Sequence, residues 1–216
     1  MAQSAPTAFY EPKLQHEMKY FIAHLLSGDA KTYHERVTRE LSARFRIVPL
    51  HERVPPHLTI KIPFEATDEQ IKDVEKVLRS FARMHRPHPF SMKGFGHFGF
   101  RTIYMDVPKG DVVFTARKCL ATLRTNAPWL PPAPLEGNKL HASVARFLSR
   151  RQFKRIWRVL TVANEPCFET SFDNISILRK DDSRWVVASR IAFGHEHFPE
   201  QSSETRKTLN SKALIS

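Results

Sequence analysis

The chain has 216 residues, and 41% of them are hydrophobic, which suits a folded domain and excludes a disordered chain. Its formal net charge of +12 at pH 7 favours polyanionic partners, of which nucleic acid is the commonest, although a merely soluble basic protein remains the alternative. No apolar run approaches the roughly 18 residues that a membrane-spanning helix needs.

The first half of the chain alternates strand and helix signals. A strand is predicted over residues 19–25, and a helix with one apolar face follows it. Alternating hydrophobicity over residues 57–62 predicts a second strand. Thr67 and Gln70 then form a capping box, which indicates the start of another amphipathic helix.

The middle of the chain predicts two strands and a helix. The strands lie around residues 89–95 and 101–107, and the helix begins near Asp111. The segment Pro128–Pro134 is rich in proline and cannot lie inside a helix, so we expect a connecting loop there.

The last third repeats the strand and capped-helix pattern. A strand is predicted over residues 140–147, and Ser149 and Gln152 form a second capping box in front of an amphipathic helix. Two further strands are predicted over residues 167–178 and 184–193. This mixed order of elements predicts an α+β protein with helices laid on sheets.

The ends of the chain carry few apolar positions and no periodicity. We therefore expect flexible tails over residues 1–17 and 198–216 and a single domain over residues 18–197. The first seven residues lack the basic and apolar regions of a signal peptide. Cys119 and Cys167 make no disulfide framework, which predicts reduced thiols in a cytoplasmic protein without membrane association.

A short motif occurs twice in matching contexts. His57–Ile60 reads HLTI and His141–Val144 reads HASV, and each motif opens a predicted strand that leads to a capped helix. Of the eleven histidines, only these two have Ser or Thr two residues later. Because whole units resemble each other, the pair is a stronger signal than either motif alone.

The strand period gives the motifs a chemical meaning. Side chains two residues apart point to the same face of a strand. His57 therefore shares a face with Thr59, and His141 shares a face with Ser143. Two imidazoles, whose ordinary pKa is about 6.5, suit the acid and the base that phosphodiester cleavage requires, and nearby hydroxyls suit the phosphate oxygens. The alternative is that each histidine only satisfies a backbone carbonyl.

At these residues the chain resembles the 2H phosphoesterase superfamily, and within it the RNA 2′,3′-cyclic phosphodiesterases, historically called 2′-5′ RNA ligases. The resemblance covers roughly residues 19–193. It implies a bilobal α+β fold, with two antiparallel sheets related by pseudo-twofold symmetry and flanked by helices. It also implies an active site in the cleft between the lobes.

The resemblance also implies site residues and a reaction. His57 and His141 would be catalytic, and Thr59, Ser143 and Arg146, which stands five residues after the second histidine, would bind the substrate phosphate. The reaction would be hydrolysis of a 2′,3′-cyclic phosphate on RNA or a nucleotide to a 2′-phosphate, by a monomer. His57 would be the acid and His141 the base, but the sequence does not distinguish this order from its reverse.

Other features are less specific. The glycine-rich, aromatic segment Gly94–Phe100 offers Phe98 and Phe100 for stacking on a base, with core packing as the alternative. Cationic residues after Ser149 could follow an RNA backbone or form a solvated helix face.

Two histidine pairs were weighed as metal ligands, and both lack cysteine or acidic partners. They are His85 with His88, and His195 with His197. No metal site and no cofactor are therefore predicted. Cleavage of 2′-5′ linkages, trimming of RNA 3′ ends, and a nucleotide- or RNA-binding module without turnover remain alternatives on the same fold.

Overall fold

The computed structural model describes residues 17–132, 138–162 and 165–194. The predicted tails, residues 1–17 and 198–216, lie outside these ranges apart from Glu17, and so do His195 and His197. In chain order the elements are β1 (Met18–Leu25), α1 (Gly28–Phe45), α2 (Leu50–Arg53), β2 (His57–Ala66), α3 (Asp68–Arg83), β3 (His88–Lys93), β4 (Phe95–Phe98), β5 (Thr102–Asp106), α4 (Asp111–Asn126), β6 (His141–Arg146), α5 (Arg150–Val162), β7 (Cys167–Phe172), β8 (Asn174–Asp181) and β9 (Arg184–Ala192).

The predicted α+β class and antiparallel sheets are confirmed, but the strands form three hydrogen-bonded sheets where two were expected. Their orders are β2-β1-β8-β9, β3-β7 and β4-β5-β6. The strand predicted over residues 167–178 is interrupted at Asp173, so that β7 pairs with β3 while β8 pairs with β1. Gly94, with a φ of 70°, turns the chain between β3 and β4 in a conformation that favours glycine.

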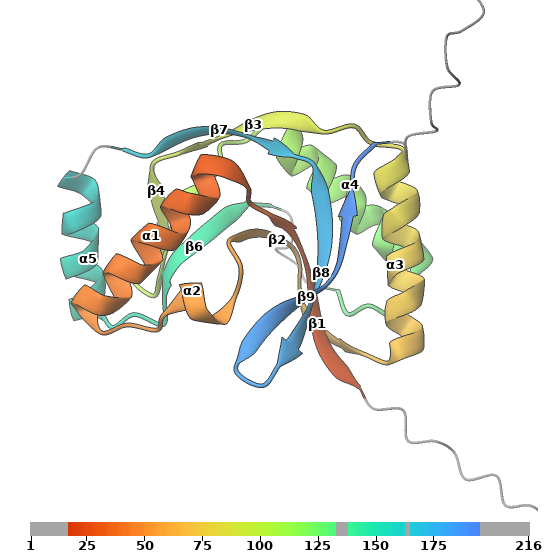
Figure 1. Ribbon diagram of the computed structural model, residues 1–216, viewed down its shortest axis with the longest axis horizontal. Coiled ribbons are helices and arrows are strands. Elements are labelled where there is room, and N and C mark those ends of the chain that lie inside the picture. Colours follow the sequence, from red (N-terminus) through yellow and green to blue (C-terminus); the bar gives the residue numbers. More distant parts are fainter. Residues whose placement is uncertain (1–16, 133–137, 163–164, 195–216) are drawn as a thin grey trace, which may run out of the picture.

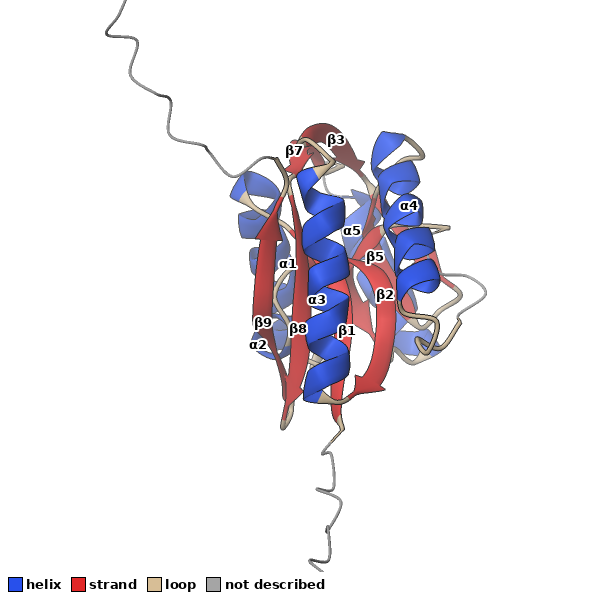
Figure 2. Ribbon diagram, turned by 90° about the vertical axis from the view of Figure 1, so that its right-hand side faces the viewer, coloured by secondary structure: helices blue, strands red, loops and turns tan. Residues whose placement is uncertain are grey.

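The sheets and helices gather into two lobes. The first lobe holds the four-stranded sheet with α3 and α4, and the second holds the other two sheets with α1 and α5 (Figure 1). Figure 2 shows α3 lying along one face of the four-stranded sheet. At the junction, β2 of the first lobe lies next to β6 of the second.

The chain passes twice through the same series of elements. The first repeat is β1-α1-β2-α3 and the second is β5-α4-β6-α5, and in each the two strands pair antiparallel. The helices cross between the lobes, because α1 packs against β6 while α4 packs against β2. The lobes therefore hold each other in place, which fixes β2 relative to β6.

Both predicted capping boxes are present. The Gln70 backbone N–H donates to Thr67 Oγ1 at 3.3 Å, and the Thr67 N–H donates to the Gln70 side chain at 2.9 Å. Ser149 and Gln152 make the same reciprocal pair at 3.2 and 3.0 Å. Each box satisfies backbone donors at a helix start and so fixes where the helix behind the motif strand begins.

The core lies beneath the apolar faces of the motif strands. Leu58 and Ile60 of β2 are buried in one cluster with Val74 and Leu78 of α3. Burying a side chain of this kind contributes about 1.5 to 3 kcal/mol. Within the described part of the chain, no helix combines the length and the apolarity that crossing a membrane requires.

Candidate active site

A cavity of about 240 Å³ lies where the two lobes meet, and it brings together both histidine motifs. Its walls come from α1, from the α2 region, from β2, and from β4, β5 and β6. The lining residues are His34, Leu50, Val54, His57, Thr59, Ile62, Pro63, Phe98, Thr102, His141, Ser143 and Arg146. Six of the seven predicted site residues are among them, and Phe100 is the exception.

Strand alternation places the motif side chains at this cavity. His57 and Thr59 of β2 are half-buried and line it, while Leu58 between them is fully buried in the core. His141 and Ser143 of β6 are placed in the same way. The two strands thus carry their histidine faces to one space from opposite lobes.

A bulge in each motif strand re-aims the residue five positions after the histidine. In β6 the register shifts between Ser143, which pairs with Tyr104, and Ala145, which pairs with Ile103. The extra residue changes the phase of the strand, so that Arg146 joins His141 at the cavity although an odd number of residues separates them.

The first motif strand has the same bulge at the same step. Thr59 pairs with Ala23 and Lys61 with Ile22, so that the residue placed like Arg146 is Ile62. The two repeats therefore build matching walls, but only the second repeat supplies a cation at this position.

Backbone hydrogen bonds fix the tautomer of both histidines. His57 Nδ1 lies 2.8 Å from the Pro55 carbonyl oxygen, and His141 Nδ1 lies 3.1 Å from that of Lys139. A carbonyl oxygen only accepts, so each Nδ1 carries its hydrogen and donates it. In both imidazoles Nε2 is left as the nitrogen that can exchange a proton with a ligand.

Aromatic rings support the two imidazoles differently. The His57 ring lies 5.0 Å from the ring of Phe21. The His141 ring lies 4.9 Å from Tyr104 and 4.8 Å from Phe98. Tyr104 needs the glycine that pairs with it across the sheet, because a Cβ at Gly96 would lie 2.5 Å from the tyrosine ring.

The cavity holds its histidines in the neutral form. Burial lowers the pKa of His57 to about 4, against the opposing effect of its hydrogen bond to Pro55. Burial also lowers the pKa of His141, by a smaller shift. The positive charge of Arg146 lowers the pKa of both imidazoles further.

His34 is a third histidine in the cavity wall, and the sequence did not indicate it. It is 4% exposed, and its Nε2 donates to the Ser143 carbonyl oxygen at 2.9 Å. Burial lowers its pKa to about 4, so the ring is neutral near pH 7. It ties α1 of the first repeat to the second motif. Since this contact spans 109 positions, no local pattern could have revealed it.

The predicted stacking residues are placed apart. Phe98 lines the cavity and is 44% exposed. Phe100 lies outside the lining, with the Arg150 guanidinium 5.0 Å from the centre of its ring. Among the described residues, no group of three or more His, Cys, Asp or Glu is placed to bind a metal ion.

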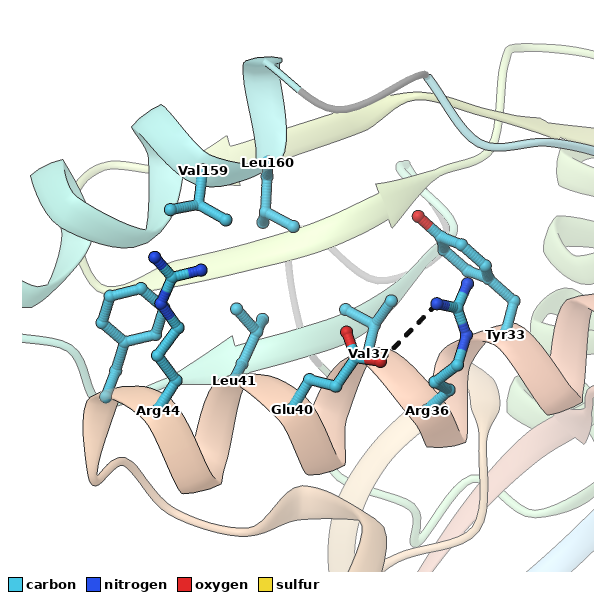
Figure 3. A pocket seen from close by; sticks show the side chains of 9 residues that line it. Tyr33, Arg36, Val37, Glu40, Leu41, Arg44, Val159 and Leu160 are labelled. Atoms are coloured by element: carbon cyan, nitrogen blue, oxygen red, sulfur yellow. Dashed lines mark ion pairs between the residues drawn. The ribbon is translucent and has the colours of Figure 1, made fainter.

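A larger cavity of about 330 Å³ lies between α1 and α5 (Figure 3). Val37 and Leu41 of α1 face Val159 and Leu160 of α5 across it, and the Arg36–Glu40 ion pair lies at its edge. It contains no residue of either motif and no histidine. The titratable pair therefore selects the smaller cavity as the candidate active site.

Comparison with known proteins agrees with this geometry. A protein of Bacillus pumilus, provisionally named a phosphoesterase, is 28% identical over 158 residues, which cover 72% of this chain and 89% of the relative. One of Geobacillus kaustophilus with a similar name is 28% identical over 145 residues, which cover 65% and 80%.

Solved structures share the fold. TT0787 of Thermus thermophilus superposes with a TM-score of 0.59 at 17% identity, over 83% of this chain and 100% of that one. Escherichia coli LigT complexed with 3′-AMP superposes with a TM-score of 0.57 at 13% identity over the same shares. Residues 30–184 match the sequence profile of the 2′-5′ RNA ligase superfamily. The chain belongs to this superfamily, the 2H phosphoesterases.

Proposed function

We propose that this phosphoesterase hydrolyses 2′,3′-cyclic phosphate ends of RNA or nucleotides to 2′-phosphates, without a metal or another cofactor. One observation carries the proposal: His57 and His141 line one cavity, and each Nδ1 is held by the backbone. Two Nε2 atoms are then available for one acid and one base, which is what an in-line displacement at phosphorus requires.

The reaction balances with these two groups. One imidazole takes a proton from water as the water oxygen bonds to phosphorus. The bond from phosphorus to the 3′ oxygen breaks, and the other imidazole donates its proton to that oxygen. The product is a 2′-phosphate with a free 3′ hydroxyl, and a proton transfer through solvent restores the starting state of the pair.

The pKa pattern favours one assignment of these roles. A base must start neutral, and the stronger lowering of the pKa of His57, to about 4, keeps that imidazole neutral. The acid must start protonated, and His141, whose pKa is lowered less, takes the first proton more readily. We therefore assign His57 as the base and His141 as the acid, the reverse of the order that the family resemblance implies.

The remaining polar groups suit the phosphate. Thr59 and Ser143 offer hydroxyl donors on the two walls, and Arg146 offers a guanidinium between the motif and solvent. These groups would stabilise the charge that builds on the non-bridging oxygens in the transition state. Phe98 stands against the His141 ring at the mouth and would contact the base of the terminal nucleotide.

The net charge and the relatives support a nucleotide substrate. The charge of +12 attracts a polyanion. LigT, which shares the fold, has been solved in complexes with 3′-AMP and with NADP+. These complexes are properties of that protein, and they make a nucleotide a suitable first ligand to test here.

The test is incubation of the purified protein, in EDTA, with an RNA that ends in a 2′,3′-cyclic phosphate. We expect conversion to a 2′-phosphate end, identified by mass and by sensitivity to phosphatase. His57→Ala and His141→Ala should abolish it while leaving the circular dichroism spectrum unchanged.

Two results would redirect the assignment. Cleavage of 2′-5′ linkages or trimming of RNA 3′ ends, without action on the cyclic phosphate, would keep the catalytic pair and change the substrate. Binding of RNA without any product would indicate a binding module on the same fold.

A further inference from the structure

An exposed aromatic ring stands immediately after the second motif strand. Phe147 follows Arg146, the last residue of β6, and is 62% exposed. Its φ of 59° is left-handed, which is unfavourable for a residue with a Cβ. A bulky ring held in such a conformation and turned toward solvent points to a binding role, since it adds little to the core.

Arg146 connects this ring to the cavity. The Arg146 side chain lines the cavity, and its guanidinium carbon lies 5.1 Å from the centre of the Phe147 ring. The ring therefore begins where the phosphate-binding wall ends. A guanidinium that contacts both positions can bind a phosphate while it lies against the aromatic face.

The neighbouring turn extends the same surface. The Leu148 N–H donates to the Arg101 carbonyl oxygen at 3.2 Å, which holds the β6–α5 turn against the β4–β5 turn. Phe100 from the second turn lies under the Arg150 guanidinium. We call this surface the aromatic rim, and its residues are Phe98, Phe100, Arg146, Phe147 and Arg150.

Cations continue beyond the rim on one side only. Helix α5 carries five lysine and arginine side chains and no acidic residue: Arg150, Arg151, Lys154, Arg155 and Arg158. On the opposite wall, the place that corresponds to Arg146 is taken by Ile62. A polyanion that leaves the cavity is therefore drawn over the aromatic rim toward α5.

We infer that Phe147 forms a second nucleotide subsite, which stacks on the base preceding the terminal nucleotide of an RNA strand. The inference rests on the proposed function for the occupant of the cavity itself. It makes an oligonucleotide, and not a mononucleotide, the preferred substrate. The terminal phosphate would lie between the histidines, the penultimate base on Phe147, and the preceding phosphates along α5.

The test is a cycle of two changes, one in the protein and one in the RNA. The ligand is a fluorescein-labelled RNA hexamer ending in a 3′-phosphate, which the proposed reaction cannot consume, and its Kd is measured by anisotropy. A second hexamer lacks only the penultimate base. Phe147→Ala should weaken binding of the intact hexamer about tenfold, within the range for one stacked base, and leave binding of the abasic hexamer unchanged.

Two variants serve as controls. Phe147→Tyr keeps the ring and should bind like the wild type. Phe114→Ala removes a ring of matching exposure, 60%, that also lies under a cation, Lys118 at 4.5 Å, but sits on α4 outside the cavity lining. It should leave both Kd values unchanged.

The outcomes are separable. An unchanged Kd in Phe147→Ala, or an equal loss for the intact and the abasic hexamer, would overturn the subsite. If neither hexamers nor cyclic mononucleotides bearing a 2′,3′-cyclic phosphate are hydrolysed, the proposed reaction fails, and the binding cycle still decides the subsite. If hydrolysis occurs, Phe147→Ala should raise the KM of the hexamer and leave that of 2′,3′-cyclic AMP unchanged.

Discussion

The two repeats build their halves of the cavity in the same way and furnish them differently. Each supplies a histidine whose Nδ1 donates to the carbonyl two residues earlier, and each bends its strand at the same step. The first repeat then offers Ile62 where the second offers Arg146. Shared geometry thus provides a matched pair of imidazoles, and the unequal surroundings give the two members different proton affinities.

The largest effect should come from separating acid from base. Loss of either histidine should lower kcat by roughly 10² to 10⁴ on a normal substrate. A cyclic phosphate with sulfur in place of the 3′ oxygen has a leaving group that needs no proton. On it His141→Ala should recover most of the rate, while His57→Ala should not. Recovery by His57→Ala instead would restore the role order that the family resemblance implies.

The Arg146 and Ile62 positions test the charge difference. Arg146→Ala should lower kcat/KM about 100-fold, because a donor to the developing phosphate charge is lost. Since Arg146 lowers the pKa of both histidines, its loss should raise both values and move the pH optimum upward. Ile62→Ala is the matched control, and a comparable loss there would contradict the asymmetry.

His34 should make the protein acid-sensitive through a contact that only α1 provides. Its pKa is about 4 in the folded protein against an ordinary 6.5, so the unfolded chain binds more protons between these values. The stability it supports is complete above pH 6.5 and falls as the pH drops toward 4. By pH 5 about 2 kcal/mol should be lost.

Urea unfolding of His34→Gln across this range measures that contribution. The variant should show a shallower decline in the free energy of unfolding than the wild type. The exposed His97→Gln should follow the wild-type slope. Equal slopes for all three proteins would remove His34 from the account.

The smallest effect concerns the helices behind the motifs. Thr67→Ala and Ser149→Ala each remove one capping box and should cost about 1 kcal/mol of stability. Thermal unfolding gives both values, and assays above the transition midpoint are avoided by working at 25 °C. Activity should stay within twofold, because neither cap lines the cavity. A large loss of activity in one variant alone would show that its helix positions the motif strand.

Local signals carried much of the fold. The motif strands, both capping boxes and the amphipathic helices behind them follow from residue period and cap chemistry, and the structure confirms them. Residues 167–178 read as one strand because nothing local marks Asp173 as the point where the chain changes sheets. The four-residue helix α2 is too short to produce a period.

The site could be predicted only in part, for a related reason. Motif spacing pairs His57 with His141, but the bulge that brings Arg146 to their cavity depends on pairing with β5. Phe147 is a strand-end residue in the sequence, and only its exposure and backbone conformation distinguish it. Such features arise when distant segments pack together.

The most direct test of the central claim is a comparison of three variants on cyclic-phosphate RNA in EDTA: His57→Ala, His141→Ala and the double variant. If the two repeats contribute to one reaction, the double variant should be no slower than the slower single variant, because residues that act as a unit are not additive. Losses that multiply in the double variant, or a single variant with wild-type turnover, would contradict the account.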